Sequence, residues 1–271
     1  MNRLRERVCL VTGSTGMAAA AAARLAAEGA AVFIVSRTEA HAADLADRIR
    51  HEGGSAEWAV ADLTDPPATD AAVAACVERF GRIDGLFSAA GGSGRRFGDG
   101  PIDTVSKEAW EQTLALNLTT QAVALRAVVE RMRRQGPNSS GTRGSIVLMG
   151  SVTSTDPAPE FFATHAYAAA KGAITGLMTT MAAAYLADRI RVNVVSPGLT
   201  DTPMATRASR DRAIRAYAAR KQPLAGEMMD PLEVAHAVVF LLSDESRAIT
   251  GQMLKVDGGW SIASVSPRGR R

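Results

Sequence analysis

The sequence predicts an α/β fold, with one doubly wound parallel sheet of seven strands and helices on both of its faces. Short apolar runs alternate with longer helical patterns along the 271 residues. Strands separated by helices form right-handed crossovers, which place parallel strands side by side in one sheet. No long linker or internal repeat divides the chain, so residues 1–271 are expected to form a single domain.

The expected strands are short apolar runs, and the expected helices between them are amphipathic or rich in alanine. Strands are expected at 7–12, 31–36, 56–61, 83–89, 144–150, 191–196 and 253–257. Helices are expected at 17–28, 38–51, 68–80, 107–135, 164–187 and 231–242. The segment 151–163 is rich in Pro, Ser and Thr and is expected to form a loop, and residues 264–271 are expected to form a frayed tail.

The composition is typical of a soluble globular protein, with 22% charged and 46% hydrophobic residues. The 31 basic and 28 acidic residues leave a net charge of +3. No basic run contains interleaved aromatic residues, so no nucleic-acid partner is expected. The longest Ala-rich stretch, 17–36, contains Arg24, Glu28 and Gly29, which favours a helix and a strand over a membrane span.

The cysteines and histidines predict no metal site. Cys9 and Cys76 lie in apolar surroundings, which is typical of buried free thiols in a reducing compartment. The four histidines are scattered and form no ligand cluster with these cysteines. The amino terminus has no apolar segment after its charged residues, so no signal peptide and a cytoplasmic location are expected.

Small and polar residues follow the expected strands at the edge where the carboxyl ends of parallel strands meet. Ligands of such sheets bind beyond this edge. Each residue alone fits ordinary turn chemistry, but together they indicate a binding site. The set comprises Gly13–Gly16, Ser36 and Arg37, Asp62, Ser88–Gly92, Ser151, and Pro197 with Gly198.

The stretch VTGSTGMAAAAAARLAAEG, residues 11–29, has the pattern of a strand end, a Gly-rich turn and a helix. The helix N-terminus after such a turn binds the pyrophosphate of a dinucleotide. Compared with the G-x-G-x-x-G fingerprint, only Gly13 and Gly16 are present, and Ala18 follows where another glycine is expected. By itself, this turn is equally compatible with a plain connector.

Y-A-A-A-K places Tyr167 and Lys171 on one face of a helix, four residues apart. A cation about 4 Å from a phenol contributes about 4 kcal/mol at an effective dielectric near 20. Lys171 is therefore expected to lower the pKa of Tyr167 by roughly three units from its usual ~10, which suits acid–base catalysis. Ser151 is expected close by, as a hydrogen-bond donor to a substrate oxygen. Asn117 is a polar residue in an apolar run and, taken alone, fits a buried structural asparagine.

These motifs, taken in order, resemble the short-chain dehydrogenase/reductase family over nearly the whole chain. The resemblance implies a Rossmann-like seven-stranded sheet and NAD(P)-dependent interconversion of carbonyl and alcohol groups. It implies that Tyr167 is the general acid/base, Lys171 its electrostatic partner and a ribose ligand, Ser151 the substrate-oxygen donor and Asn117 a water-holding relay residue. The motifs are T-G-x-x-G (12–16), Asp62, AAG (89–91), Asn117, Ser151, Tyr167, Lys171, SPG (196–198) and VDGG (256–259).

The expected cofactor contacts follow from the same resemblance and from the sheet edge. They are Gly13, Ser14, Thr15, Gly16, Met17, Ser36, Arg37, Asp62, Leu63, Ala89, Ala90, Gly91, Tyr167, Lys171, Pro197, Gly198 and Thr200.

Two departures from the family pattern concern cofactor binding. The family turn T-G-x-x-x-G-x-G is one residue shorter here and ends in Ala18, which changes which N–H groups face a pyrophosphate. The usual N-N-A-G after the fourth strand reads Ser88-Ala89-Ala90-Gly91, without either amide side chain. Neither departure touches the expected proton-transfer residues.

The residues after the second strand favour NADP(H), with NAD(H) possible. NAD-binding Rossmann folds carry an acidic residue there, on the ribose hydroxyls. This chain has Ser36 and Arg37 and no acid before Glu39. Arg37 suits the 2′-phosphate of NADP, with Ser36 as a second donor, although a surface arginine at a helix start would give the same pattern.

Residues 200–229 resemble the family's mobile substrate lid and carry six basic residues against three acidic ones. They fit a solvated charged helix. They also fit an anionic or carrier-bound substrate, such as an acyl thioester on an acidic carrier protein, with Arg95 and Arg96 adding to the field. The basic residues are Arg207, Arg210, Arg212, Arg215, Arg220 and Lys221.

The leading hypothesis is an oxidoreductase that interconverts a ketone and a secondary alcohol. The alternatives are a 3-oxoacyl-thioester reductase of the same family and a nucleotide-binding regulator that has lost turnover. The family resemblance also implies a homotetramer or homodimer, formed through helices 107–135 and 164–187. The small residues Ala166, Ala169, Ala170 and Ala173 are the expected contact face.

Overall fold

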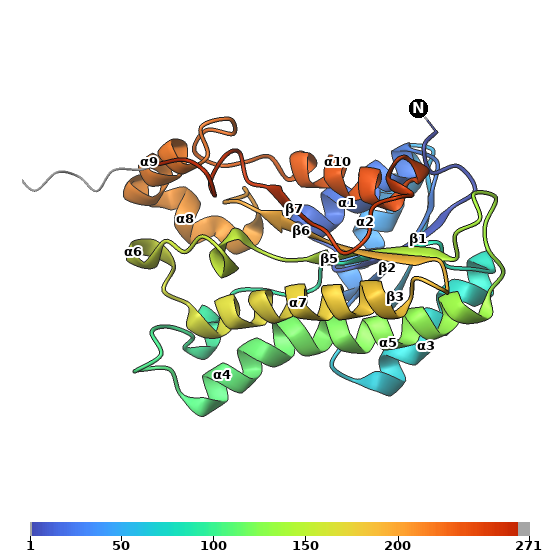
Figure 1. The fold of residues 1–271 in the computed structure, drawn as a ribbon, viewed down its shortest axis with the longest axis horizontal. Helices are drawn as coiled ribbons and strands as arrows, with labels where there is room; N and C mark the ends of the chain where they lie inside the picture. The colour runs from blue at the N-terminus through green and yellow to red at the C-terminus, as the bar shows by residue number, and fades with distance from the viewer. Residues whose placement is uncertain (1, 265–271) are drawn as a thin grey trace, which may run out of the picture.

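A seven-stranded, fully parallel sheet forms the centre of the computed structural model, which describes residues 2–264 (Figure 1). The strand order is β3-β2-β1-β4-β5-β6-β7. The expected fold class is confirmed, and every expected strand is found within two residues of its predicted ends. The strands are β1 (Val8–Thr12), β2 (Ala31–Ser36), β3 (Ser55–Val60), β4 (Gly85–Ser88), β5 (Gly144–Met149), β6 (Ile190–Pro197) and β7 (Met253–Val256).

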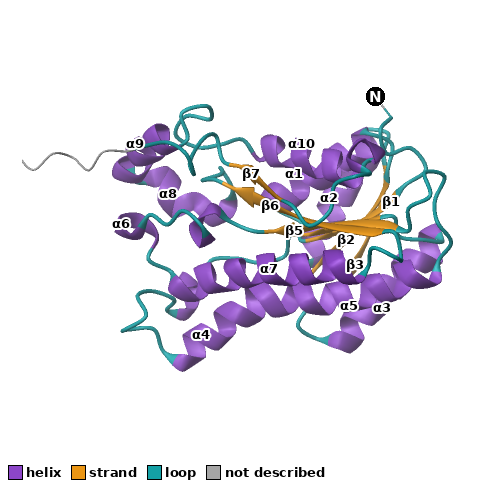
Figure 2. Ribbon diagram, in the orientation of Figure 1, coloured by secondary structure: helices purple, strands orange, loops and turns teal. Residues whose placement is uncertain are grey.

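Helices cover both faces of the sheet (Figure 2). On one face, α1 (Gly16–Ala27), α2 (Glu39–His51) and α10 (Pro231–Leu242) pack over a core that contains Leu25, Leu45 and Val238. On the other face, α3 (Pro66–Phe80), α5 (Thr120–Arg134) and α7 (His165–Ala184) pack over Val73, Val128 and Ile174. The sheet is therefore buried between two helical layers, as a parallel sheet requires.

The expected helix 107–135 is one continuous rod whose hydrogen-bond pattern changes in the middle. It consists of α4 (Lys107–Leu114), a π-helical turn at Ala115–Thr119 and α5. Ser106 begins the rod by accepting a hydrogen bond from the N–H of Ala109. Turns of π-helix inside α-helices occur mostly at functional sites, and this one contains Asn117.

The segment 151–163 is more ordered than the expected loop. It contains a 3₁₀ turn at Val152–Ser154 and the short helix α6 (Pro159–Phe162), which Pro159 starts at its first position. Most of the expected tail, from residue 265 onward, lies outside the described residues.

The expected lid, residues 200–229, contains a 3₁₀ turn at Pro203–Ala205 and the helices α8 (Thr206–Arg210) and α9 (Arg212–Lys221). A β-bridge between Thr200 and Met229 joins the two ends of the segment. Figure 1 shows α6, α8 and α9 together at one end of the molecule, near the carboxyl ends of β5 and β6. The lid segment is thus placed over the edge where ligands of doubly wound sheets bind.

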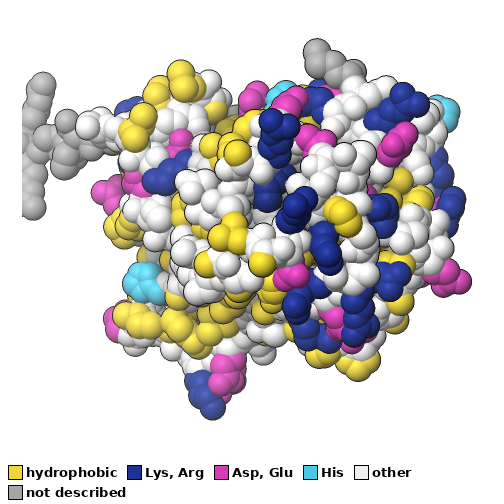
Figure 3. Space-filling view, turned by 45° about the vertical axis from the view of Figure 1, so that its right-hand side comes forward, with side chains coloured by type: hydrophobic (Ala, Val, Ile, Leu, Met, Phe, Trp, Pro, Cys, Tyr) yellow, Lys and Arg dark blue, Asp and Glu magenta, His cyan; other side chains and the backbone are white. Residues whose placement is uncertain are grey.

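Many basic side chains on the surface have acidic partners. Figure 3 shows Lys and Arg side chains gathered over the middle of one face, with acidic side chains among them. Along α5, Arg126 pairs with Asp70, Arg133 with Asp188 and Arg134 with Glu130. Within residues 2–264, no helix is long and apolar enough to cross a bilayer.

Candidate active site

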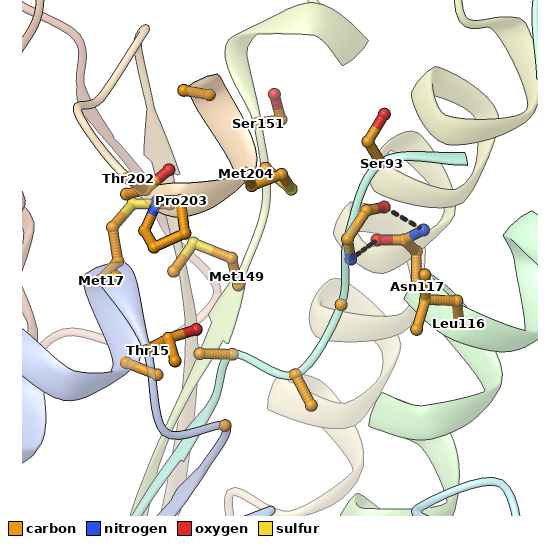
Figure 4. Close-up of a pocket in the computed structure, with 18 of the residues that line it drawn as sticks. Thr15, Met17, Ser93, Leu116, Asn117, Met149, Ser151, Thr202, Pro203 and Met204 are labelled. Atoms are coloured by element: carbon orange, nitrogen blue, oxygen red, sulfur yellow. Dashed lines mark hydrogen bonds between the residues drawn. The ribbon is translucent and has the colours of Figure 1, made fainter. Parts of the chain in front are cut away.

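A cavity of about 770 Å³ opens at the carboxyl ends of the strands. Every residue expected to act in catalysis or cofactor binding lines it. In Figure 4, Thr15 and Met17 border it on the side of α1, Thr202 and Pro203 come from the lid, and Ser151 and Asn117 face it from other sides. The site residues predicted from the sequence therefore lie together in one cavity, and the role of each residue stays a prediction.

The shortened Gly-rich turn still forms an anion-binding geometry. Gly13 and Gly16 have positive φ angles of 96° and 55°, and α1 begins at Gly16 without a side-chain cap. The first N–H groups of α1 are therefore free to meet a phosphate. A Cβ on Gly13 would lie 3.2 Å from the Cβ of Ala18, so alanine already fills the space beside the turn. The turn fits a dinucleotide pyrophosphate.

The loop after β4 is held by side chains from other elements. The hydroxyl of Thr12, fully buried at the end of β1, accepts hydrogen bonds from the N–H groups of Ala89 and Ala90, at 2.9 and 3.0 Å. Asn117 holds the far end of the loop through the N–H and C=O of Gly92 (Figure 4). The absence of asparagine at 88 and 89 therefore leaves the loop anchored at both ends.

The part of the cavity beyond β2 is polar, and Arg37 contributes a guanidinium group to it. The hydroxyls of Ser14 and Ser36 lie 2.8 Å apart, and Arg37 and His41 line the same region. Glu39 is not among the cavity-lining residues of the described chain. Asp62 accepts hydrogen bonds from the N–H and hydroxyl of Thr64, which, with Arg37 adding to the effect, lower the pKa of its carboxyl.

Tyr167, Lys171 and Ser151 converge below the lid. Lys171 is only 2% exposed, and its Nζ donates a hydrogen bond to the backbone oxygen of Met149 at 2.9 Å. The same Nζ lies 5.6 Å from the centroid of the Tyr167 ring. Ser151 follows β5 and is held by a 2.9 Å contact between its hydroxyl and that of Thr153. A phenol, an ammonium and a hydroxyl thus share one cavity wall, which is a suitable set for proton transfer to an oxygen.

The expected lowering of the Tyr167 pKa is wrong for the ligand-free protein. Burial raises the pKa of this phenol, and the Ser151 hydroxyl beside it offsets the rise only in part. Burial also lowers the pKa of Lys171 to about 7, so the ammonium is incompletely protonated at neutral pH. The prediction placed a full positive charge about 4 Å from the phenol at an effective dielectric near 20, whereas Lys171 is buried, Tyr167 is half-buried on the cavity wall, and desolvation dominates.

Asn117 is placed by the π-helical turn rather than by ordinary helix geometry. Its Nδ2 donates to the backbone oxygens of Thr113 and Gly92, both at 3.0 Å, and its Oδ1 accepts from Gly92 N–H at 3.1 Å. A Cβ on Gly91 would lie 2.8 Å from this Oδ1, so only glycine fits there without displacement. The side chain therefore joins α4 to the β4 loop, and a relay function stays a prediction.

Gln121 belongs to this site and was not predicted. It is fully buried, and its Nε2 donates to the backbone oxygens of Asn117, at 3.2 Å, and Met149, at 3.3 Å. The oxygen of Met149 thus accepts from both Gln121 and Lys171. In the sequence, the only sign of this role is the spacing of four residues from Asn117.

Asp99 is a second residue that the sequence did not single out. Its buried carboxylate accepts hydrogen bonds from the N–H groups of Ala166 and Tyr167, both at 3.0 Å. A carboxylate at the first turn of α7 stabilises the helix and fixes the position of Tyr167 within that turn. Nothing local in the sequence connects residues 99 and 167.

Comparisons with known proteins agree with this site. Residues 11–261 match the family model described as enoyl-(acyl carrier protein) reductase. The chain is 37% identical over 260 residues to the short-chain reductase protein NovJ of Streptomyces niveus, covering 94% of each chain. It is 34% identical over 263 residues to the 2,5-dichloro-2,5-cyclohexadiene-1,4-diol dehydrogenase LinX of Sphingobium indicum, covering 96% of this chain and 98% of the relative.

A solved structure of a short-chain type dehydrogenase/reductase from Mycobacterium ulcerans superimposes with a TM-score of 0.87 and 31% identity, covering 96% of this chain and 91% of that one. The family model spans most of the chain, and both sequence relatives match it over nearly their whole length. The chain therefore belongs to the short-chain dehydrogenase/reductase family and is an NAD(P)-dependent oxidoreductase that acts on alcohol and carbonyl groups.

Proposed function

We propose that this protein interconverts a ketone and a secondary alcohol with NADP(H), and that Tyr167 is its general acid/base. The observation that carries the proposal is the convergence of Ser151, Tyr167 and Lys171 with the Gly-rich turn on one cavity. These residues come from β1, β5 and α7, so the arrangement does not follow from any local motif. It also favours turnover over a nucleotide-binding regulator, because no element of the proton-transfer set is missing.

In the direction of reduction, the Ser151 hydroxyl donates a hydrogen bond to the substrate carbonyl oxygen. The Tyr167 hydroxyl transfers its proton to that oxygen as negative charge develops there. Lys171 stabilises the resulting tyrosinate. The nicotinamide supplies the hydride. Burial raises the pKa of the Tyr167 phenol, so the phenol is protonated at neutral pH and has a proton to donate to the carbonyl oxygen.

NADP(H) is the proposed nucleotide because the guanidinium of Arg37 and several polar side chains line the cavity beyond β2. Arg37 and His41 line the cavity there, with the Ser14 and Ser36 hydroxyls beside them. Guanidinium groups bind phosphate oxygens with charge-assisted hydrogen bonds. Asp62 follows β3 rather than β2, and its Oδ1 accepts both hydrogen bonds from Thr64, so it is not the ribose-binding acid expected after β2.

Fluorescence titration with NADPH and, separately, NADH tests the nucleotide. We expect NADPH to bind at least about tenfold more tightly, as one charge-assisted contact predicts. Arg37→Gln should weaken NADPH alone, while Arg48→Gln, a control at an exposed arginine of α2 paired with Asp44, should change neither affinity. Tighter binding of NADH would overturn the nucleotide choice, and no binding of either would overturn the site.

Tyr167→Phe tests the chemistry. The variant keeps the ring and removes the hydroxyl group that carries the transferred proton, so turnover should fall by about 10²–10⁴-fold. Its affinity for the nucleotide, measured by the same titration, should stay within about threefold. Retained turnover would exclude Tyr167 as the acid/base.

Assembly and location are proposed from weaker observations. We propose a homotetramer or homodimer in the cytoplasm, where the buried thiols of Cys9 and Cys76 would stay reduced. Ala166 and Ala170 pack inside the protomer, which corrects half of the expected contact face. The exposed residues of α7 include the small residues Ala169, Gly172, Ala173 and Gly176, and light scattering tests whether copies associate.

A further inference from the structure

Two arginine side chains meet at one backbone oxygen at the substrate end of the cavity. Arg95, in the 3₁₀ turn at Gly94–Phe97, donates from a terminal guanidinium nitrogen to the oxygen of Phe161 at 3.1 Å. Arg207 of α8 donates to the same oxygen at 2.9 Å. Both residues line the cavity that contains Ser151 and Tyr167. Two like charges from different segments are therefore held together at this end of the cavity.

Neither guanidinium has an ion-pair partner among residues 2–264. Burial and the charge of Arg207 lower the pKa of Arg95, and Asp99 opposes this only weakly. Both carboxylate oxygens of Asp99 already accept the N–H groups of Ala166 and Tyr167. Each guanidinium carries five N–H donors, and most of them stay available to an anion.

The other lid cations differ from this pair. Arg215 is paired with Glu227 at 2.6 Å and Lys221 with Asp156 at 3.2 Å, and neither lines the cavity. Arg210, Arg212 and Arg220 are exposed, have no ion-pair partner among residues 2–264 and lie outside the cavity. Among the lid cations only Arg207 lines the cavity, so an anion inside the site meets Arg207 together with Arg95.

The surface beside the two arginines is aromatic. Phe162 and Trp260 line the cavity, with ring centroids 6.2 Å apart, and Arg207 lies 5.8 Å from the Phe162 ring centroid. Met149 and Met204 add apolar surface to the cavity, and Figure 4 shows Met204 near Ser151. A ligand with an apolar body and one anionic group fits this combination.

We propose that Arg95 and Arg207 form an anion subsite that binds the carboxylate of a small keto or hydroxy acid, with its apolar body against Phe162 and Trp260. The inference rests on the proposed function, since it names the substrate class of the same cavity. The carboxylate takes the free donors of both guanidinium groups and relieves their mutual repulsion. Because Arg207 is in the lid segment and Arg95 is not, the anion also joins the lid to the β4 loop.

The test compares two ketones that differ only in charge, 4-oxocyclohexanecarboxylate and 4-oxocyclohexanecarboxamide. In the native protein, kcat/KM should favour the carboxylate by at least about tenfold, through KM. The double variant Arg95→Gln/Arg207→Gln should bring the ratio close to one and leave the amide nearly unaffected. Arg210→Gln, an exposed α8 residue outside the cavity, should retain the ratio, which should also fall with added salt.

A ratio near one in the native protein, or a ratio that the double variant retains, would overturn the subsite while leaving the oxidoreductase intact. If neither ketone is reduced, the proposed function fails for this class, and binding of the unreactive cyclohexanecarboxylate decides the subsite by calorimetry. Saturable binding that the double variant loses and Arg210→Gln keeps would support it. Absence of binding to the native protein would overturn it.

Discussion

Lys171 should make the stability of the ligand-free protein rise with pH, and Lys171→Met should remove this dependence. Burial lowers the pKa of the ammonium from 10.5 to about 7. Between these pH values the unfolded chain holds a proton that the folded chain has released, so stability increases as pH rises through this window. Below it, keeping the ammonium buried costs about 5 kcal/mol, at about 1.4 kcal/mol per pKa unit.

The free-energy cost of burying the Lys171 ammonium changes across a pH range in which unfolding can be measured. The cost falls from about 5 kcal/mol near pH 6 to about 2 kcal/mol near pH 9, because the unfolded lysine is still mostly protonated at the higher pH. Urea unfolding of the native protein and of Lys171→Met, at matched pH, measures the difference directly. The native protein should gain about 3 kcal/mol relative to the variant between these two pH values.

A matched lysine variant separates this effect from the other titrations of the protein. Lys107 is 79% exposed and pairs only with Glu111, at 3.6 Å, so Lys107→Met should give a curve parallel to that of the native protein. Parallel curves for Lys171→Met as well would show that Lys171 keeps an ordinary pKa. The explanation given above for the raised pKa of Tyr167 would then also be wrong.

Two further predictions concern residues that hold the site in place. Asp99→Asn should cost about 1–2 kcal/mol of stability, as loss of a charged helix cap does, and should lower kcat through misplacement of Tyr167. The exposed Asp103→Asn should change neither quantity, and an unchanged kcat in Asp99→Asn would limit Asp99 to a structural role. Gly13→Ala and Gly53→Ala both put alanine at positive φ, 96° and 85°, and should each lose about 1 kcal/mol. Only Gly13→Ala should also weaken nucleotide binding, by at least about tenfold, and equal affinities in the two variants would remove the turn from the binding site.

The strands and most helix ends could be predicted because their causes are local. Strand β1 is an apolar run that the sheet buries completely, and such runs are recognisable wherever they occur. Pro231 starts α10, and the preceding Asp230 accepts a hydrogen bond from Leu232 N–H, which is a start signal visible in three residues. The missed helix α6 has only four residues, too few to give a periodic pattern.

Only those features of the site that follow from residue spacing and strand order could be predicted from the sequence. Tyr167 and Lys171 share a helix face because of the helical repeat, and Ser151 adjoins them because parallel strands end at one edge. The environment of these groups depends on contacts that no spacing reveals: Met149 supplies the oxygen that binds Lys171, and Asp99 binds the N–H of Tyr167 from 68 residues away. Burial then reverses the sign of the expected Tyr167 shift, because desolvation acts on the whole surroundings of a group, whereas the sequence argument counted one neighbouring charge. The lid arginines carry equal charges in the sequence, and only the structure shows which of them can meet a ligand. Arg207 alone among them lines the cavity.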